Sequence, residues 1–184
     1  MAFSENTPES SWDIYTLPLD LSDPEHPKAG KAEPFLRTPA MESRPLFSPD
    51  GHWLAYQSNE SSQFEVFVRP FPGPGGKWQI STGGGMMPVW SRNGRELFYR
   101  TIDSRILVAN YTARGDTFQA DKPKLWSEKS LPSAGSHSNF DLAPDGKRFA
   151  VILAPGGGEE KPPNHVTFLL NFFDELRRKA PGKN

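Results

Sequence analysis

Short runs of apolar residues, each bounded by turn-forming residues, recur along most of the chain. Three of them, at residues 54–56, 97–99 and 149–151, follow a glycine after two intervening residues. A longer run at residues 64–71 alternates between apolar and other residues, and it resembles a run at 13–19. The two runs align at an offset of 52 residues, which also matches their prolines, Pro18 and Pro70. Alternation with a period of two predicts half-buried β-strands. The pattern therefore predicts an all-β fold made of short strands.

The turns that precede the three short runs share one plan. FSPDG at residues 47–51, WSRNG at 90–94 and LAPDG at 142–146 place their glycines 43 and 52 residues apart. Serine suits the first position of a type I turn, proline supplies the φ angle of the second, and Asp or Asn suits the third. Glycine then takes the left-handed conformation that closes a hairpin with a bulge. The residues predicted to make these turns are Ser48, Pro49, Asp50, Gly51, Asn93, Gly94, Pro144, Asp145 and Gly146.

Two further strands follow each hairpin. Third strands are predicted at residues 105–111 and 165–171, in addition to the two alternating runs, and weaker outer strands at 34–38, 77–81 and 124–127. Four antiparallel strands in about 40–45 residues are typical of a β-propeller blade. We therefore expect a partial β-propeller of about three four-stranded antiparallel blades, with a short C-terminal helix. A β-sandwich is the competing all-β architecture, but it does not require the same turn in every unit.

The repeats also predict the organisation of the chain. We expect a flexible N-terminus (1–10), then a partial propeller (11–172) and a short helix and tail (173–184). The propeller divides into a half-blade (11–40), two blades (41–83 and 84–130) and a last blade (131–172). This amounts to roughly three and a quarter blades, whereas closed propellers use about four to eight. The expected partners are therefore the remaining blades of a longer chain or a second copy of this one.

The residues of the turns and of the following strands resemble a known family. FSPDG followed by a short aromatic-rich strand resembles the repeat of TolB-type β-propellers, which are related to WD-repeat proteins. The stretch from Phe47 to Tyr99, with VRPFPG at 68–73 and WQISTGG at 78–84, resembles the C-terminal propeller region of bacterial serine/threonine-kinase-like sensor proteins. This resemblance implies a recognition or scaffold module at the C-terminus of a larger protein. The alternative is the propeller portion of a hydrolase, such as a prolyl-oligopeptidase-type peptidase, whose catalytic domain lies elsewhere.

Charge and composition exclude several classes of function. Lysine and arginine number 21 against 22 acidic residues, whereas nucleic-acid-binding proteins usually carry a basic excess, so no nucleic-acid partner is expected. The chain has no cysteine and four scattered histidines, so we expect no disulfide, no metal and no cofactor. The longest strongly apolar stretch, at 166–173, is far shorter than the ~20 residues of a membrane-spanning helix. No membrane span is therefore expected, and the sequence assigns no compartment.

Motifs of catalysis are missing from the sequence. AGSHS at residues 134–138 lacks the second glycine of a Gly-x-Ser-x-Gly elbow. GPGGKW at residues 73–78 lacks the spacing and the hydroxyl of a phosphate-binding loop, and kinase signature motifs are also missing. We therefore expect a chain that is not an enzyme, with any kinase or peptidase activity outside it.

The loops that enter the innermost strands, and those between second and third strands, are the candidate binding surface. In a propeller these loops gather on one face of the ring. Arg44, Met87 and Asn139 are predicted to hold equivalent positions in three units. The units would therefore present different side chains at the same distance from the propeller axis. The partner, a protein or a small molecule, is not identified by the sequence. The candidate binding residues are Arg44, Asn59, Glu60, Met87, Asp103, His137 and Asn139.

Overall fold

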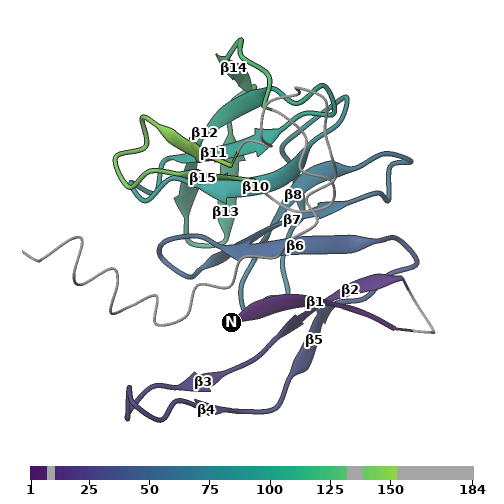
Figure 1. The fold of residues 1–184 in the computed structure, drawn as a ribbon. Helices are drawn as coiled ribbons and strands as arrows, with labels where there is room; N and C mark the ends of the chain where they lie inside the picture. The colour runs from purple at the N-terminus through teal and green to yellow at the C-terminus, as the bar shows by residue number, and fades with distance from the viewer. Residues whose placement is uncertain (8–10, 132–138, 153–184) are drawn as a thin grey trace, which may run out of the picture. The chain divides into compact units, whose positions relative to one another are not determined.

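The computed structural model of the chain describes residues 1–7, 11–131 and 139–152, and every regular element within these ranges is a β-strand (Figure 1). These strands belong to one compact unit, Met1–Ala154. The predicted strand at 165–171, the predicted helix within 173–184 and His137 lie outside the described residues. All described strand pairs are antiparallel, as the sequence predicts.

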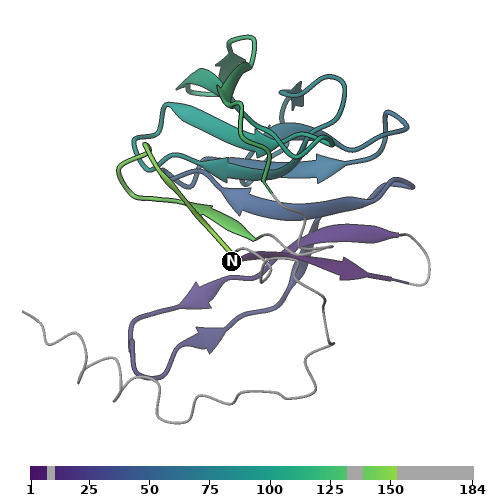
Figure 2. The ribbon, with the colours of Figure 1, turned by 45° about the horizontal axis from the view of Figure 1, so that its top comes forward.

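Three main sheets and a final hairpin follow one another in the order of the chain (Figure 2). The first sheet contains β1 (Ala2–Asn6), β2 (Trp12–Thr16) and β5 (Glu33–Leu36). The second contains β6 (Glu42–Phe47), β7 (Trp53–Ser58), β8 (Glu65–Pro70) and β9 (Trp78–Gln79). The third contains β10 (Met86–Trp90), β11 (Glu96–Arg100), β12 (Ile106–Arg114), β13 (Thr117–Ala120) and β14 (Lys124–Ser127). The final hairpin pairs β15 (Phe140–Leu142) with β16 (Phe149–Val151), and the whole series has the architecture of a partial β-propeller.

The first strand corrects part of the expected flexible N-terminus (1–10), because residues 2–6 form β1, while residues 8–10 lie outside the described residues. β1 pairs with β2 along its full length, and the ring of Phe3 stacks on that of Tyr15 with centroids 5.8 Å apart and planes at 22°. Tyr56 stacks on Phe67 in the same way, at 5.8 Å and 26°, so β1 and β2 repeat the packing of β7 and β8. β1 is held in its sheet by this pairing and by the half-buried ring of Phe3.

The three turns at Gly51, Gly94 and Gly146 share one geometry. Their φ angles are 74°, 66° and 68°, in the region that only glycine enters without strain. Each glycine N–H donates to the carbonyl oxygen three residues earlier, at 2.9, 3.1 and 2.9 Å respectively. The Asp or Asn before each glycine accepts the backbone N–H two residues further on. This is a type I turn followed by a left-handed glycine.

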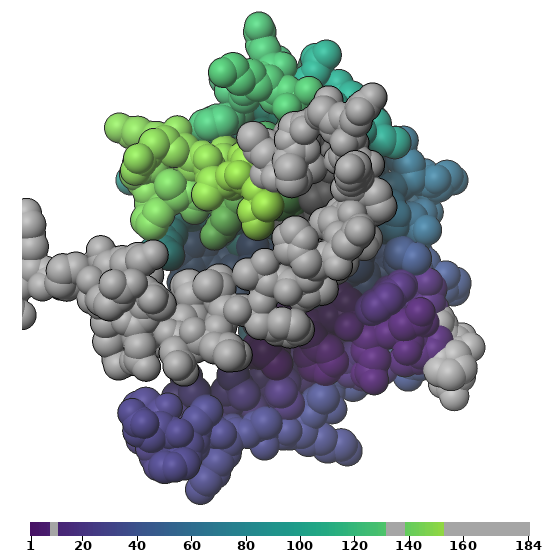
Figure 3. All heavy atoms as spheres, viewed as in Figure 1, coloured from purple at the N-terminus to yellow at the C-terminus, as the bar shows by residue number. Residues whose placement is uncertain are grey.

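Two features of the sheets differ from the expected strands. A hairpin of β3 (Leu19–Asp20) and β4 (Lys28–Ala29) is inserted between β2 and β5, and it projects from the first sheet (Figure 3). β12 continues to Arg114 and turns back at Gly115 into β13, so the third sheet has five strands instead of four. The hairpin at Gly115 lies in a segment that the repeat pattern leaves unassigned, because the other units have no counterpart of it.

Apolar clusters lie between successive sheets. Alternate residues of a strand point to opposite faces of its sheet, so β7 directs Leu54 and Tyr56 toward the first sheet and Trp53 and Ala55 toward the third. The first cluster contains Ile14, Leu54, Tyr56 and Phe67. The second contains Trp53, Ala55, Val66, Val68, Ile80, Trp90, Leu97, Tyr99, Ala109, Tyr111 and Phe118. The third contains Phe98, Ile106 and Phe140.

Hydrogen bonds also join the second sheet to the third. The indole Nε1 of Trp90 donates to the carbonyl oxygen of Leu46, at 2.9 Å, and so links the innermost strands β10 and β6. The backbone N–H of Met87 donates to the Oε1 atom of Gln57, also at 2.9 Å. These directional contacts fix the position of β10 relative to β6 and β7.

Candidate functional site

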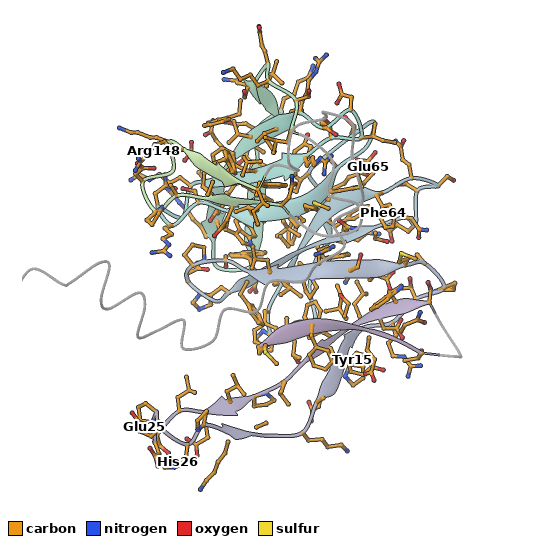
Figure 4. All side chains as sticks on the ribbon, viewed as in Figure 1. Tyr15, Glu25, His26, Phe64, Glu65 and Arg148 are labelled. Atoms are coloured by element: carbon orange, nitrogen blue, oxygen red, sulfur yellow. The ribbon has the colours of Figure 1, made fainter. Side chains whose placement is uncertain are left out.

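The two ends of the sheets carry different kinds of connection. The tight turns that join first to second strands lie at one end, where Figure 4 labels Arg148. The opposite end, marked there by Phe64 and Glu65, carries the loops between second and third strands and the segments that enter each next sheet. We call this opposite end the loop end, and it consists of residues 37–44, 58–65, 80–87 and 100–106.

A buried carboxylate, Glu65, organises the loop end of the second sheet. Its oxygens accept hydrogen bonds from Gln63 Nε2 at 2.8 Å, from the backbone N–H of Gly84 at 2.9 Å and from the hydroxyl of Ser81. The Ser81 Oγ atom in turn accepts the N–H of Val66, at 2.7 Å. Glu65 therefore ties the start of β8 to the segment that leads into β10.

Glu42 is a second buried carboxylate, at the start of the innermost strand β6. Its Oε1 atom accepts a hydrogen bond from Thr38 Oγ1 at 2.5 Å, and its Oε2 atom has no hydrogen-bond partner among the described residues. Burial raises the pKa of Glu42 above its ordinary value, the Thr38 hydrogen bond opposes this rise, and the negative charge of Asp13 adds to it. Asp13 is itself fully buried and lies 3.3 Å from Arg37 Nε.

The loops between second and third strands are held by their own hydrogen bonds. Ser62 and Ser104 have φ angles of 75° and 67°, and each donates its N–H to the carbonyl three residues earlier, at 3.0 Å. Asn59 Oδ1 accepts the N–H of Met41, at 2.8 Å, so this candidate residue caps the innermost strand. Asp103 accepts the hydroxyl of Thr101 and pairs with Arg105, and these contacts lower the pKa of its carboxyl.

One open pocket of about 500 Å³ lies at the loop end of the second sheet. It is lined by Thr38, Pro39, Ala40, Asn59 and Glu60. The Glu60 carboxylate pairs at 2.5 Å with the ammonium group of Lys77. Glu60 belongs to the lining of this pocket, and buried Glu42 accepts a hydrogen bond from Thr38, which also lines it. Two carboxylates are therefore associated with the pocket.

Arg44 and Met87 hold equivalent places in bulges of the innermost strands. Their φ angles are 58° and 54°, and each precedes a proline, Pro45 or Pro88, at the shift in register of its strand. Proline has no N–H to contribute to the ladder, which confines it to edges and bulges. Met87 is half-buried and packs against the third apolar cluster, so its side chain is less accessible than an exposed binding residue.

Asn139 departs from the predicted equivalence with Arg44 and Met87. Phe140 stands where the other two strands have proline, and β15 pairs with β16 without a shift in register. Asn139 is 3% exposed and faces Ile152, whose carbonyl accepts its Nδ2–H at 3.0 Å. The structure therefore brings Arg44, Asn59, Glu60, Met87 and Asp103 to the loop end and places Asn139 inside the final hairpin.

The sequence pattern missed two features of the loop end. The first is Ile102, an apolar side chain that is 74% exposed beside Gly84 at the tip of its loop. The second is the pair of buried carboxylates, Glu42 and Glu65, each of which begins a strand. An acidic residue directly before an apolar run was the available signal for Glu65, which precedes Val66, Phe67 and Val68, whereas Glu42 precedes Ser43 and Arg44 and carries no such signal.

Within the described ranges, no three His, Cys, Asp or Glu side chains gather closely enough to hold a metal ion. The same residues include no helix that is long and apolar enough to cross a membrane.

Comparisons with known proteins add little beyond the fold. No family model and no curated protein sequence matches the chain. Among solved structures, TolB from Acinetobacter baumannii is similar, with a TM-score of 0.47 and 17% identity over 85% of this chain. The match covers 47% of that TolB, so the chain spans about half the length of this similar protein.

Proposed function

We propose that this chain is a non-catalytic recognition or scaffold module that binds its partner at the loop end. One observation carries the proposal: successive sheets present unlike side chains on hydrogen-bonded loops at the same end. In the turns closed by Ser62 and Ser104, Asn59 is matched by Thr101, Glu60 by Ile102 and Ser61 by Asp103. Such a surface combines polar contacts with one apolar anchor.

The loops are suited to binding without rearrangement. The loops of Ser62 and Ser104 are closed by backbone hydrogen bonds, and Glu60 is held by Lys77. Preformed loops lose little conformational freedom on binding, and this lowers the cost of association. Ile102 supplies an exposed apolar group of the kind that a partner would cover.

The larger context of the module is part of the same proposal. The resemblance of residues 47–99 to kinase-like sensor proteins supports a place at the C-terminal, sensor end of a larger bacterial protein. The alternative is the propeller portion of a peptidase. The coding sequence upstream of residue 1 separates the two, since a kinase domain there supports the sensor and a peptidase domain overturns it.

Partner capture tests the proposed surface. A loop-end variant, Ile102→Ser with Asp103→Asn, and a turn-end control, Arg148→Ser, are compared with the unchanged chain in cross-linking from the source bacterium. We expect the loop-end variant to lose a specifically captured protein and the control to keep it. Equal capture by all three chains would refute a loop-end recognition surface.

A further inference from the structure

A small pocket of about 260 Å³ lies between the first and second sheets, at the end that carries the tight turns. One side of it is Phe35 of β5, and the other is the end of β8 with the loop that follows. Pro70 at the end of β8 lies opposite Trp53, which directly follows the first tight turn. The described lining consists of Phe35, Arg69, Pro70 and residues 72–75.

Among these lining residues Arg69 alone carries a charge, and its side chain is half-buried. Its Nε atom donates to the hydroxyl oxygen of Tyr56, at 3.2 Å. Burial raises the pKa of Tyr56 to about 12, so this partner is an uncharged hydroxyl at neutral pH. The two terminal amino groups of Arg69 donate to no described residue, and no described carboxylate pairs with them. Arg69 therefore keeps four N–H donors and its positive charge for a ligand.

The loop that completes the pocket is held against the end of β8. The N–H of Phe71 donates to the carbonyl oxygen of His52 at 2.8 Å, and its ring contacts that of Phe35 with centroids 5.8 Å apart. Gly75 lies against the ring of Pro70, so close that a Cβ atom at this glycine would come within 2.3 Å of Pro70 Cγ. These contacts form the pocket before any ligand binds, as is usual for ligand sites.

The charge and the apolar lining together indicate the chemistry of the ligand. A planar guanidinium pairs well with a carboxylate, which accepts two parallel N–H bonds. One guanidinium balances the single charge of a carboxylate, whereas a phosphate group carries about −1.5 to −2 at pH 7. Phe35 and the proline rings offer apolar surface against which an aromatic ring can pack. The pocket is smaller than the roughly 300–1,000 Å³ of sites for drug-sized ligands, so it suits a group of side-chain size.

We propose that Arg69 and this pocket bind a carboxylate that is attached through a short chain to an aromatic ring. Two sources carry this chemistry: a small aromatic acid, and the C-terminus of a polypeptide whose last residue is aromatic. Every lining residue named above lies between Phe35 and Gly75, within two consecutive sheets of the described chain. The pocket is at the opposite end of the sheets from the loop end, so it can fail or succeed independently of the proposed function.

The test titrates the full 184-residue chain, in separate NMR experiments, with hydrocinnamate and with a short alanine peptide that ends in phenylalanine and a free carboxylate. We expect saturable shifts of the Arg69 side-chain Nε–H and of the Gly73 and Gly75 amides, with a millimolar Kd for hydrocinnamate. The neutral amide of each ligand should bind about tenfold or more weakly, because it lacks the charge that pairs with the guanidinium. Tighter binding of the peptide than of hydrocinnamate assigns the site to a polypeptide C-terminus, and equal or weaker binding assigns it to a small acid.

Arg69→Gln removes the charge and should weaken hydrocinnamate binding about tenfold or more, and Arg69→Lys should recover only part of the loss because it lacks the planar fork. Arg148→Gln is the matched control, since Arg148 is an exposed arginine at the same end of the sheets but outside the pocket, and it should leave the affinity unchanged (Figure 4). Dispersed amide spectra establish that the variants are folded, and the comparison of acid with amide uses the unchanged chain. Unchanged affinity of Arg69→Gln would overturn the proposal, as would equal binding of acid and amide. Absence of shifts at Arg69 and Gly75 up to about 10 mM of both ligands would overturn it as well.

Discussion

Phe118 of β13 offers the sharpest test of how the second and third sheets pack. Its side chain is 2% exposed and stacks on Tyr111 at 5.0 Å, and it contacts Trp53 at 5.1 Å and Trp78 at 6.0 Å between ring centroids. Phe118→Ala removes a buried ring from this cluster and should lower the free energy of unfolding by about 3–5 kcal/mol. Phe118→Leu refills much of the volume, so it should cost only about 1–2 kcal/mol.

Urea denaturation followed by tryptophan fluorescence and by circular dichroism measures these losses. Leu125→Ala on β14 is the control, because Leu125 is an exposed apolar residue of the same sheet and its truncation should cost less than about 0.5 kcal/mol. A double-mutant cycle between Trp53 and Phe118 should give a coupling of about 0.5–1.5 kcal/mol. A loss below about 1 kcal/mol for Phe118→Ala would refute the packing of β13 against the second sheet.

Three further outcomes follow from single contacts. Arg92→Pro should stabilise the chain by about 0.4–1 kcal/mol in urea denaturation, because its turn matches two that already carry proline there, and any destabilisation would contradict the shared turn geometry. Glu65→Ala should cost at least about 2 kcal/mol in the same assay, because it leaves the N–H of Gly84 and the hydroxyl of Ser81 buried without their acceptor, whereas a loss as small as that of a surface substitution would contradict this network. The pKa of Glu42 is raised above the ordinary value of 4.5 for a glutamate, so ionisation of this carboxyl destabilises the folded chain as the pH rises above 4.5. Glu42→Gln should therefore raise the melting temperature at pH 7, and this gain should disappear below pH 4.5. An equal gain at both pH values would contradict burial of an ionising carboxyl at that position.

The parts of the fold that the sequence predicts are those in which local chemistry repeats. The turns ending at Gly51, Gly94 and Gly146 need a residue in the left-handed conformation, which only glycine adopts without strain. The sequence therefore predicts these turns. The pattern does not predict β1, although Ala2 and Phe3 repeat Ala55 and Tyr56, because it identifies a strand by the turn before it and only Met1 stands before Ala2 in this sequence.

The candidate site was less predictable because its geometry depends on contacts between sheets. Arg44 and Met87 share a bulge because proline follows each, whereas Asn139 precedes Phe140 and enters a regular ladder. All three residues lie seven positions before the glycine of their turn, so the spacing alone predicts equivalent positions. The spacing does not show whether the next residue has a backbone N–H for the strand ladder. Burial of Glu42 and exposure of Ile102 depend on neighbouring loops that no single repeat contains.

Interstrand NOEs between Hα protons provide the most direct check that the sheets repeat in one register, which is what brings their loops to the same end. The non-hydrogen-bonded pairs of an antiparallel ladder bring these protons closest, because their Cα atoms are about 4.5 Å apart. The structure predicts strong NOEs for three equivalent pairs: Ala2 with Thr16, Ala55 with Val68, and Phe98 with Val108. A one-residue displacement of the NOE partner in any one sheet would exchange the side chains on the two faces of that sheet and would contradict the account.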